Sequence, residues 1–219
     1  MVCISILAVK YWETNPSSSP REVMMSRLGQ FFAGLGWKSF YNGFCRVWKT
    51  PKTAEYDGFE VVETTDSVGL LVFNKTDRAL VFVSQNRSAA IRPDNPKGEV
   101  VEILAGRLDV GICSRGQMVK EALEELGLTV YEHEIIFPNG GFPLAASPGI
   151  LTEKMVLGYV EVTADRFSAG ETFGSDPGEV TRRVQIPVNI LESCPFGDMK
   201  TWACVQWFIA HQPKKQRRK

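Results

Sequence analysis

Histidine is scarce in this chain: only His133 and His211 occur among its 219 residues. A metal site built from several histidines is therefore excluded. The five cysteines form no CxxC pair and no cysteine–histidine pair at zinc-ligand spacing, which argues against a structural zinc site. Their odd number favours a reduced intracellular compartment over a disulfide framework.

An excess of charge of either sign is also missing. Lys plus Arg and Asp plus Glu both total 25, so the formal net charge is zero. This balance gives no reason to expect nucleic acid or an anionic membrane as the main partner. The one strong charge run, residues 214–219, is interpreted as a solvated basic tail, with a binding or targeting signal as the alternative. No apolar stretch reaches the roughly 18 residues of a transmembrane helix, and we expect a soluble, cytoplasmic protein.

Internal repeats are absent as well, and 44 % of the residues are hydrophobic, enough for a packed core. Hydrophobic patterning predicts strands at residues 44–48, 59–63, 67–73, 78–83, 100–104, 155–162 and 182–188. It predicts helices at residues 115–126 and 199–210, the first between Ser114 as N-cap and Gly127 as stop. Residues 1–36 are interpreted as an extension with a strand at 4–9 and a helix from Pro20. The order strands, helix, strands, helix favours a mixed sheet with helices packed against it.

Three glutamates on the predicted helix at residues 115–126 are the candidate metal ligands. Glu121, Glu124 and Glu125 stand at i, i+3 and i+4 and therefore share one helix face. Carboxylate oxygens of this kind suit Mg²⁺ or Mn²⁺. Taken alone, the pattern is also that of an ordinary surface helix with a solvated acidic stripe.

Residues 106–128 resemble the Nudix box, G-x5-E-x7-R-E-U-x-E-E-x-G-U, in which U is an aliphatic residue. The positions that match are Gly106, Glu121, Ala122, Glu124, Glu125, Gly127 and Leu128. Ile112 stands where the family has its first glutamate, and Lys120 stands where it has arginine. In the family, those two residues mainly support the geometry of the loop and helix.

The resemblance extends over about residues 59–211 and is closest to the nucleotide-sugar and ADP-ribose diphosphatase branch. It rests on residues 65–74, 83–87 (V-x-Q-x-R), 102–106 (E-x-x-A-G), 147–153 (S-P-G-x-x-x-E) and 207–209. The resemblance implies an α/β (α+β) fold, the Nudix αβα sandwich with a mixed β-sheet and an N-terminal β extension. It implies a homodimer in which residues 1–58 are an extension with dimerisation strands, residues 59–213 the Nudix hydrolase domain, and residues 214–219 the basic tail.

The resemblance also implies roles for single residues. Glu121 and Glu125 are the expected principal ligands of Mg²⁺, with Mn²⁺ as an alternative metal. Glu124 shares metal binding or charge, and the backbone carbonyl of Ala105 is a further ligand. In the loop of residues 165–179, Glu179 is the first choice for a catalytic or metal-binding glutamate. Glu171 and Asp176 of the same loop are as well explained by an ordinary acidic loop.

Four further residues are candidate substrate contacts. Arg87 carries a planar guanidinium suited to phosphate oxygens, with a surface ion pair as the competing interpretation. Glu102 is expected to support the box or contact the substrate, and Arg107 to approach the phosphates. Glu153 is expected to hold a substrate hydroxyl or a ligand loop.

The expected function is Mg²⁺-dependent hydrolysis of the pyrophosphate bond of a nucleoside diphosphate sugar, of ADP-ribose or UDP-glucose type, to a nucleoside monophosphate and a sugar phosphate. A second hypothesis is hydrolysis of another capped nucleotide, such as a dinucleotide or coenzyme. A third, supported by Ile112, is a degenerate Nudix domain that binds a nucleotide or protein partner without turnover.

Overall fold

The computed structural model describes residues 34, 36, 38–42, 45–55, 57–174 and 180–212. It divides into two compact units. The first contains the described residues up to 67 together with 107–113 and 143–155, and the second contains 68–106, 114–142 and the described residues from 156 onward. The strand expected at 4–9, the helix expected from Pro20 and the basic tail lie outside the described residues.

The first unit contains a three-stranded antiparallel sheet. Its strands are β1 (Lys38–Asn42), β2 (Arg46–Lys49) and β3 (Glu60–Glu63), with β2 in the centre. The short strand β8 (Leu144–Ala145) pairs antiparallel with Lys154 and Met155, the first residues of β9 (Lys154–Val162). The strands predicted at 44–48 and 59–63 are thus confirmed as β2 and β3, with slightly shifted ends.

The second unit is organised around a sheet in which the strands follow the order β10 (Thr172–Phe173), β11 (Thr181–Pro187), β5 (Ala79–Asn86), β4 (Ser67–Asn74) and β9. In addition, β6 (Glu99–Glu102) pairs with β5, and β7 (Leu104–Arg107) pairs with β4. The strands predicted at 67–73 and 78–83 are confirmed as β4 and β5, which pair antiparallel through Val72 and Val81. Nearly every residue of these two strands is buried, as expected for strands covered on both faces.

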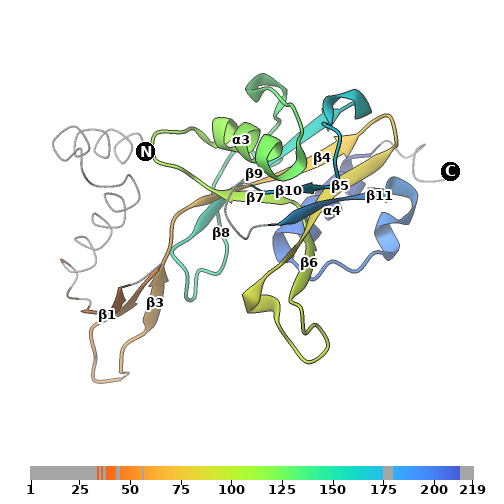
Figure 1. The fold of residues 1–219 in the computed structure, drawn as a ribbon. Helices are drawn as coiled ribbons and strands as arrows, with labels where there is room; N and C mark the ends of the chain where they lie inside the picture. Colours follow the sequence, from red (N-terminus) through yellow and green to blue (C-terminus); the bar gives the residue numbers. More distant parts are fainter. Residues whose placement is uncertain are drawn as a thin grey trace. The chain divides into compact units, whose positions relative to one another are not determined.

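Two helices cover this sheet on opposite faces (Figure 1). They are α3 (Ser114–Leu126) and α4 (Met199–His211), close to the predicted bounds. Two neighbouring residues of β9 contact different helices, because successive side chains of a strand point to opposite faces of the sheet. Gly158 lies against Met118 of α3, whereas the ring of Tyr159 lies 5.2 Å from that of Trp207 on α4. The expected αβα arrangement with a multi-stranded sheet is therefore confirmed.

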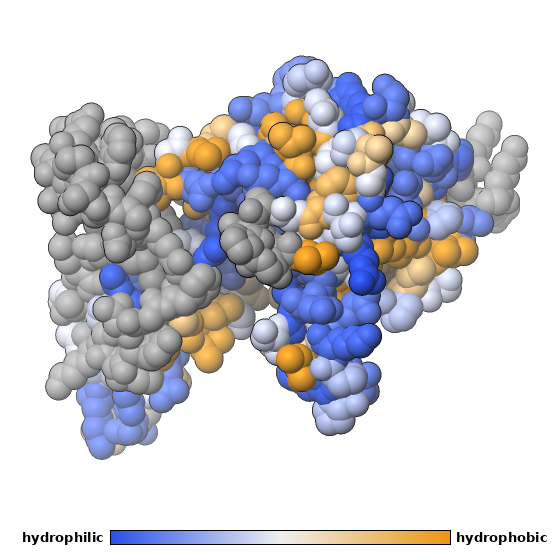
Figure 2. Space-filling model, viewed as in Figure 1, coloured by the Kyte–Doolittle hydropathy of each residue, from blue (hydrophilic) through white to orange (hydrophobic). Residues whose placement is uncertain are grey.

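Hydrophilic residues make up most of the face drawn in Figure 2, with separate hydrophobic groups among them. No helix among the described residues is long and apolar enough to cross a membrane.

One carboxylate of the first unit is fully buried. Glu63 of β3 accepts a hydrogen bond from Nε1 of Trp48 at 2.6 Å, and Nη1 of Arg46 lies 3.8 Å from its other oxygen. Burial raises the pKa of Glu63, while the Trp48 hydrogen bond and the charge of Arg46 oppose this shift. The net pKa shift is upward, so the folded state holds the Glu63 proton more tightly than the unfolded state does.

This shift predicts a pH dependence of stability. Stabilisation from Glu63 is present below its ordinary pKa of 4.5 and is lost as the pH rises through the raised folded value. Glu63→Gln stays neutral and keeps an acceptor for Trp48. Its melting temperature should therefore fall less than that of the wild type between pH 4.5 and about pH 8. Thermal melts across this range check the prediction, with the exposed Glu60→Gln on the same strand as control. A wild-type slope in Glu63→Gln would contradict it.

Candidate active site

Helix α3 buries polar as well as apolar residues. Gln117, Glu121 and Glu125 follow one another at four-residue spacing and form a stripe along the helix. Gln117 and Glu125 are buried, the latter only 4 % exposed, and Glu121 is half-buried. This burial differs from that of an ordinary surface helix, whose acidic stripe would face solvent. The carboxylates at positions 121 and 125 thus lie in the protein interior or at its margin.

The carboxylate of Glu121 lies directly against the backbone of β7. A Cβ atom added at Gly106 would lie 1.9 Å from its Oε1 and 2.0 Å from its Cδ. Nε2 of Gln117 donates a hydrogen bond to the same Oε1 at 2.8 Å. Glu121 is therefore oriented by a helix neighbour on one side and by a glycine backbone on the other. Ala105, whose carbonyl is an expected ligand, directly precedes that glycine on β7.

The end of α3 is attached to β11. The buried Thr181 donates a hydrogen bond from Oγ1 to the main-chain carbonyl of Glu125 at 3.0 Å. Glu124, one residue earlier, is half-exposed. The structure thus brings Glu121 and Glu125 to one side of α3, with Glu124 at the margin of the same turn.

The donor set of this stripe consists of oxygen atoms, as Mg²⁺ and Mn²⁺ prefer. In the part of the chain that the structure describes, no three Asp, Glu, His or Cys side chains gather closely enough to hold a metal ion by themselves. Mg²⁺ does not require such a cage, because it keeps several waters and is bound through one or two carboxylates plus substrate phosphates. The residues present therefore fit this ion.

A second buried carboxylate, Glu102 of β6, is bound by cations. Only 3 % exposed, it accepts hydrogen bonds from Nε of Arg87 at 2.8 Å and Nε2 of Gln85 at 3.1 Å. It also pairs with Lys200, whose Nζ lies 2.9 Å from Oδ1 of Asp198. Arg87 remains 42 % exposed beside this network. The ion pair considered for Arg87 is therefore present, while part of its guanidinium side chain still faces solvent.

The other predicted residues are spread more widely. In the first unit, Arg107 is exposed, and Glu153 is half-buried and accepts a 2.5 Å hydrogen bond from Oγ of Ser67. Glu171 is exposed in the second unit. Glu179 and Asp176 lie outside the described residues.

The two positions that depart from the Nudix pattern are both accessible. Ile112 is 38 % exposed and Lys120 is exposed. Neither substitution leaves a large apolar or charged side chain enclosed in the core.

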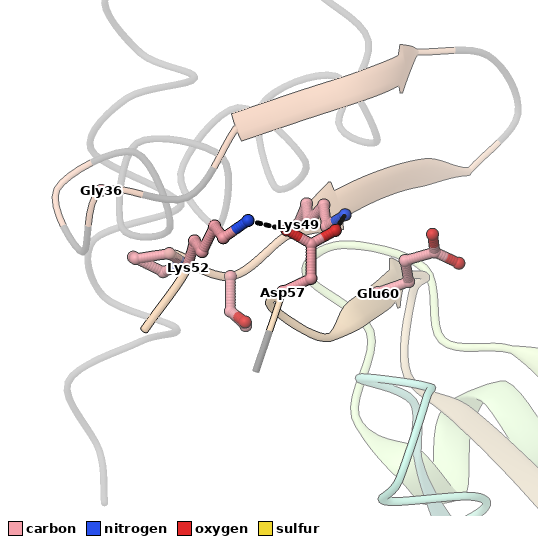
Figure 3. A pocket seen from close by; sticks show the side chains of 7 residues that line it. Gly36, Lys49, Lys52, Asp57 and Glu60 are labelled. Carbon is pink, nitrogen blue, oxygen red and sulfur yellow. Dashed lines mark hydrogen bonds and ion pairs between the residues drawn. The ribbon is translucent and has the colours of Figure 1, made fainter. Parts of the chain in front are cut away.

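A hollow of about 520 Å³ lies elsewhere, in the first unit (Figure 3). Asp57 in its wall is paired with Lys49 at 3.0 Å and Lys52 at 3.1 Å, and these hydrogen bonds lower the pKa of Asp57. None of the residues predicted for catalysis, metal or substrate lines it. The hollow is therefore not the candidate active site.

Several residues of the site were not predicted. Gln117 could have been found from its four-residue spacing to Glu121, which places an amide beside the carboxylate. Asp198 has a sequence signal as the N-cap of α4, where it accepts from the Thr201 backbone nitrogen at 2.9 Å. Lys200 has no such signal, because Glu102 lies 98 residues away in the chain.

Relatives of known activity cover part of the chain. A GDP-mannose pyrophosphatase of Enterobacter sp. (strain 638) is 34 % identical over 115 residues, 51 % of this chain and 56 % of the relative. The GDP-mannose pyrophosphatase of Cronobacter sakazakii is 32 % identical over 124 residues, 55 % of this chain and 60 % of the relative. The match thus spans little more than half the length of these relatives.

The fold has a counterpart among solved structures. A crystal structure of an ADP compounds hydrolase matches with a TM-score of 0.61 at 13 % identity, covering 83 % of this chain and 94 % of that one. No family model matches the chain. At 13 % identity the structural match shows a shared fold, and the sequence matches show similarity to the two pyrophosphatases over about half of the chain.

The contact at Gly106 predicts the effect of one methyl group. In Gly106→Ala the side chain of Glu121 must rotate away from β7, since even its Cγ lies 2.5 Å from the added Cβ. A flexible side chain can move without unfolding the helix, so the melting temperature should change little. Mn²⁺ affinity should fall about tenfold or more, because ligand orientation is lost. Gly197→Ala, where the methyl group meets nothing within 4 Å, is the control. Equal Mn²⁺ affinity in both variants would refute the assignment of Glu121.

Proposed function

We propose that this chain is a Nudix hydrolase that requires Mg²⁺ and cleaves the pyrophosphate bond of a nucleoside diphosphate sugar. The products are a nucleoside monophosphate and a sugar phosphate. One observation carries the proposal: the carboxylate of Glu121 lies against Gly106, the first glycine of the box, with the buried Glu125 one helical turn further on. These residues match the box in sequence, and they adjoin in the fold.

Hydrolysis of a diphosphate ester has to overcome the charge of the phosphates, which repels an incoming hydroxide. A bound divalent cation supplies charge neutralisation and a coordinated water of lowered pKa. Glu121 and Glu125 would hold it, with the carbonyl of Ala105 and the half-exposed Glu124 sharing the task. Gln117 keeps Glu121 in one orientation through its 2.8 Å hydrogen bond.

The bond changes are those of a simple hydrolysis. Water adds its hydroxyl to one phosphorus, the bridging oxygen leaves with the other phosphate, and one proton is released. We assign a catalytic or metal-binding role to Glu179 from the family resemblance. Arg87 is assigned a phosphate contact, because its partly exposed guanidinium is held by Glu102 and can direct its outer nitrogens to an anion. Arg107, Glu153 and Glu102 remain assigned to substrate binding.

The choice of substrates to test follows from the comparisons. Two sequence relatives are named for GDP-mannose and the structural relative for ADP compounds. We therefore expect turnover of at least one of GDP-mannose, ADP-ribose and UDP-glucose, with dinucleotides as the competing class. Chromatography of the products should show a nucleoside monophosphate and a sugar phosphate in equal amounts. Removal of divalent ions with a chelator should abolish turnover, and Mg²⁺ or Mn²⁺ should restore it. Turnover that survives the chelator would refute the metal-dependent mechanism.

The ligand assignment predicts the effect of removing one negative charge. Glu121→Gln and Glu125→Gln keep the side-chain shape but lose an anionic ligand, so kcat should fall by at least about a hundredfold. Both proteins should still fold, as judged by circular dichroism and thermal melting. Glu192→Gln removes the same charge from an exposed position of the 3₁₀ helix η4 (Val188–Ser193) and should keep wild-type turnover. Near-normal kcat in either α3 variant would disprove the assignment.

The alternative function is binding of a nucleotide or protein partner without turnover. It is favoured by Ile112, which replaces the first glutamate of the box and cannot act as a ligand or ion-pair partner. A protein that binds nucleotide sugars but yields no product with Mg²⁺ or Mn²⁺ would establish this alternative. Homodimer formation through residues 1–58 and a cytoplasmic location are likewise proposed from the resemblance and the composition.

A further inference from the structure

Arg183 of β11 gathers three backbone carbonyls from two distant segments. Nη1 donates to the carbonyl of Leu126 at 3.1 Å, and Nη2 donates to that of Gly170 at 2.7 Å. Both nitrogens also approach the carbonyl of Ser168 at 3.4 Å. One guanidinium therefore joins the last residue of α3 to the loop that precedes β10.

The contact between Arg183 and Leu126 lies at the C-terminal end of α3. The last carbonyls of a helix have no intrahelical partner, and they form the negative end of the helix dipole. A cationic side chain bound there donates hydrogen bonds to these carbonyls, and its positive charge interacts favourably with the negative end of the dipole. The preceding carbonyl, that of Glu125, is bound by Thr181 from the same strand at 3.0 Å. Two residues of β11 thus bind the final two carbonyls of α3.

The loop is closely fitted around the same guanidinium. Cζ of Arg183 lies 4.9 Å from the ring centroid of Phe167 and 5.3 Å from that of Phe173, distances typical of cation–π contacts. Gly127, directly after α3, has a φ of +58°, and a Cβ there would lie 2.0 Å from Oγ of Ser168. The Ser168 backbone nitrogen donates to the Gly127 carbonyl at 2.8 Å. Helix end, loop and strand therefore approach one another closely at Gly127, where a Cβ atom would overlap with Ser168.

We propose that Arg183 is a positioning residue for the metal-binding carboxylates of α3, an inference that rests on the proposed function. Its contacts are to backbone carbonyls and aromatic rings, and it acts on Glu125 through the helix end. Arg183 binds the carbonyl of Leu126, and Glu125 directly precedes Leu126 in the chain. A small rotation or shift at this end of α3 changes where the oxygens of Glu125, and of Glu121 one turn earlier, are presented. Outer groups that orient metal ligands in this way typically contribute about tenfold to a hundredfold in metal affinity or activity.

The test compares Arg183→Met with Arg182→Met. Arg182 is the adjacent residue of β11, is exposed, and pairs across the sheet with Thr172 and Ser84. Arg182→Met removes the same charge on the opposite side of the strand, because successive side chains of a strand point to opposite faces. Mn²⁺ binding is measured by electron paramagnetic resonance on the purified full chain, without substrate and well below the melting temperature. We expect Arg183→Met to weaken Mn²⁺ binding about tenfold or more, and Arg182→Met to stay within about twofold of wild type.

Arg183→Lys provides a second measurement, should Arg183→Met fail to fold. A single ammonium can bind the Leu126 carbonyl but cannot bridge all three carbonyls as the planar guanidinium does. Its Mn²⁺ affinity should lie between those of wild type and Arg183→Met, or below wild type if the latter cannot be purified. Where turnover is found, kcat should fall while KM changes by less than about twofold, since Arg183 does not contact substrate.

The outcomes separate this inference from the proposed function. Mn²⁺ affinity in the Arg183 variants equal to that of Arg182→Met, even with a lowered melting temperature, would show a purely structural role and overturn the inference. Mn²⁺ binding that depends on Arg183 in a protein that hydrolyses no nucleotide sugar would overturn the function and retain the inference. A wild-type protein that binds no Mn²⁺ would overturn both.

Discussion

The contact between the carboxylate of Glu121 and the bare backbone of Gly106 is the constraint on which the candidate site depends. It requires a glycine, because a Cβ at position 106 would lie 1.9 Å from Oε1 of Glu121. It also ties α3 to β7, so that a charged helix residue lies against the strand residue that directly follows Ala105. A carboxylate and a carbonyl from two elements can share one cation only when such a close approach exists. The remaining features of α3 can be understood as ways to maintain it.

Glu121 and Glu125 of α3 are partly or fully buried, so their interaction partners matter for stability. An ionised carboxylate removed from water is costly unless it is paired, hydrogen-bonded or bound to a metal. Glu102 meets this condition with Arg87, Gln85 and Lys200, and forms a network that is complete within the protein. Glu121 receives a neutral amide, Gln117, on one oxygen. The amide orients the carboxylate, which suits a group proposed as a metal ligand.

Local signals explain what the sequence could predict. The strands β4 and β5 follow from continuous runs of mostly aliphatic or aromatic residues. The helix α3 follows from helical hydrophobic spacing, with Gly127 as the helix stop at a φ of +58°. Strands of two residues, such as β8 and β10, are too short to show any period. Pairings such as Lys200 with Glu102, or Thr181 with Glu125, join residues that are far apart in the chain and depend on the finished sheet. For Arg87, the sequence left two interpretations, and the ion pair is present while its contact with substrate stays a prediction.

The departures from the Nudix pattern can be weighed against these contacts. In the family, a glutamate and an arginine support the helix, and this chain has Ile112 and Lys120 at those positions. Here α3 is constrained along its length by other means: Gly106 and Gln117 orient Glu121, and the side chains of Thr181 and Arg183 bind the carbonyls at its end. None of these contacts involves position 112 or 120. The described position of α3 is therefore supported by several interactions that do not depend on the residues at positions 112 and 120.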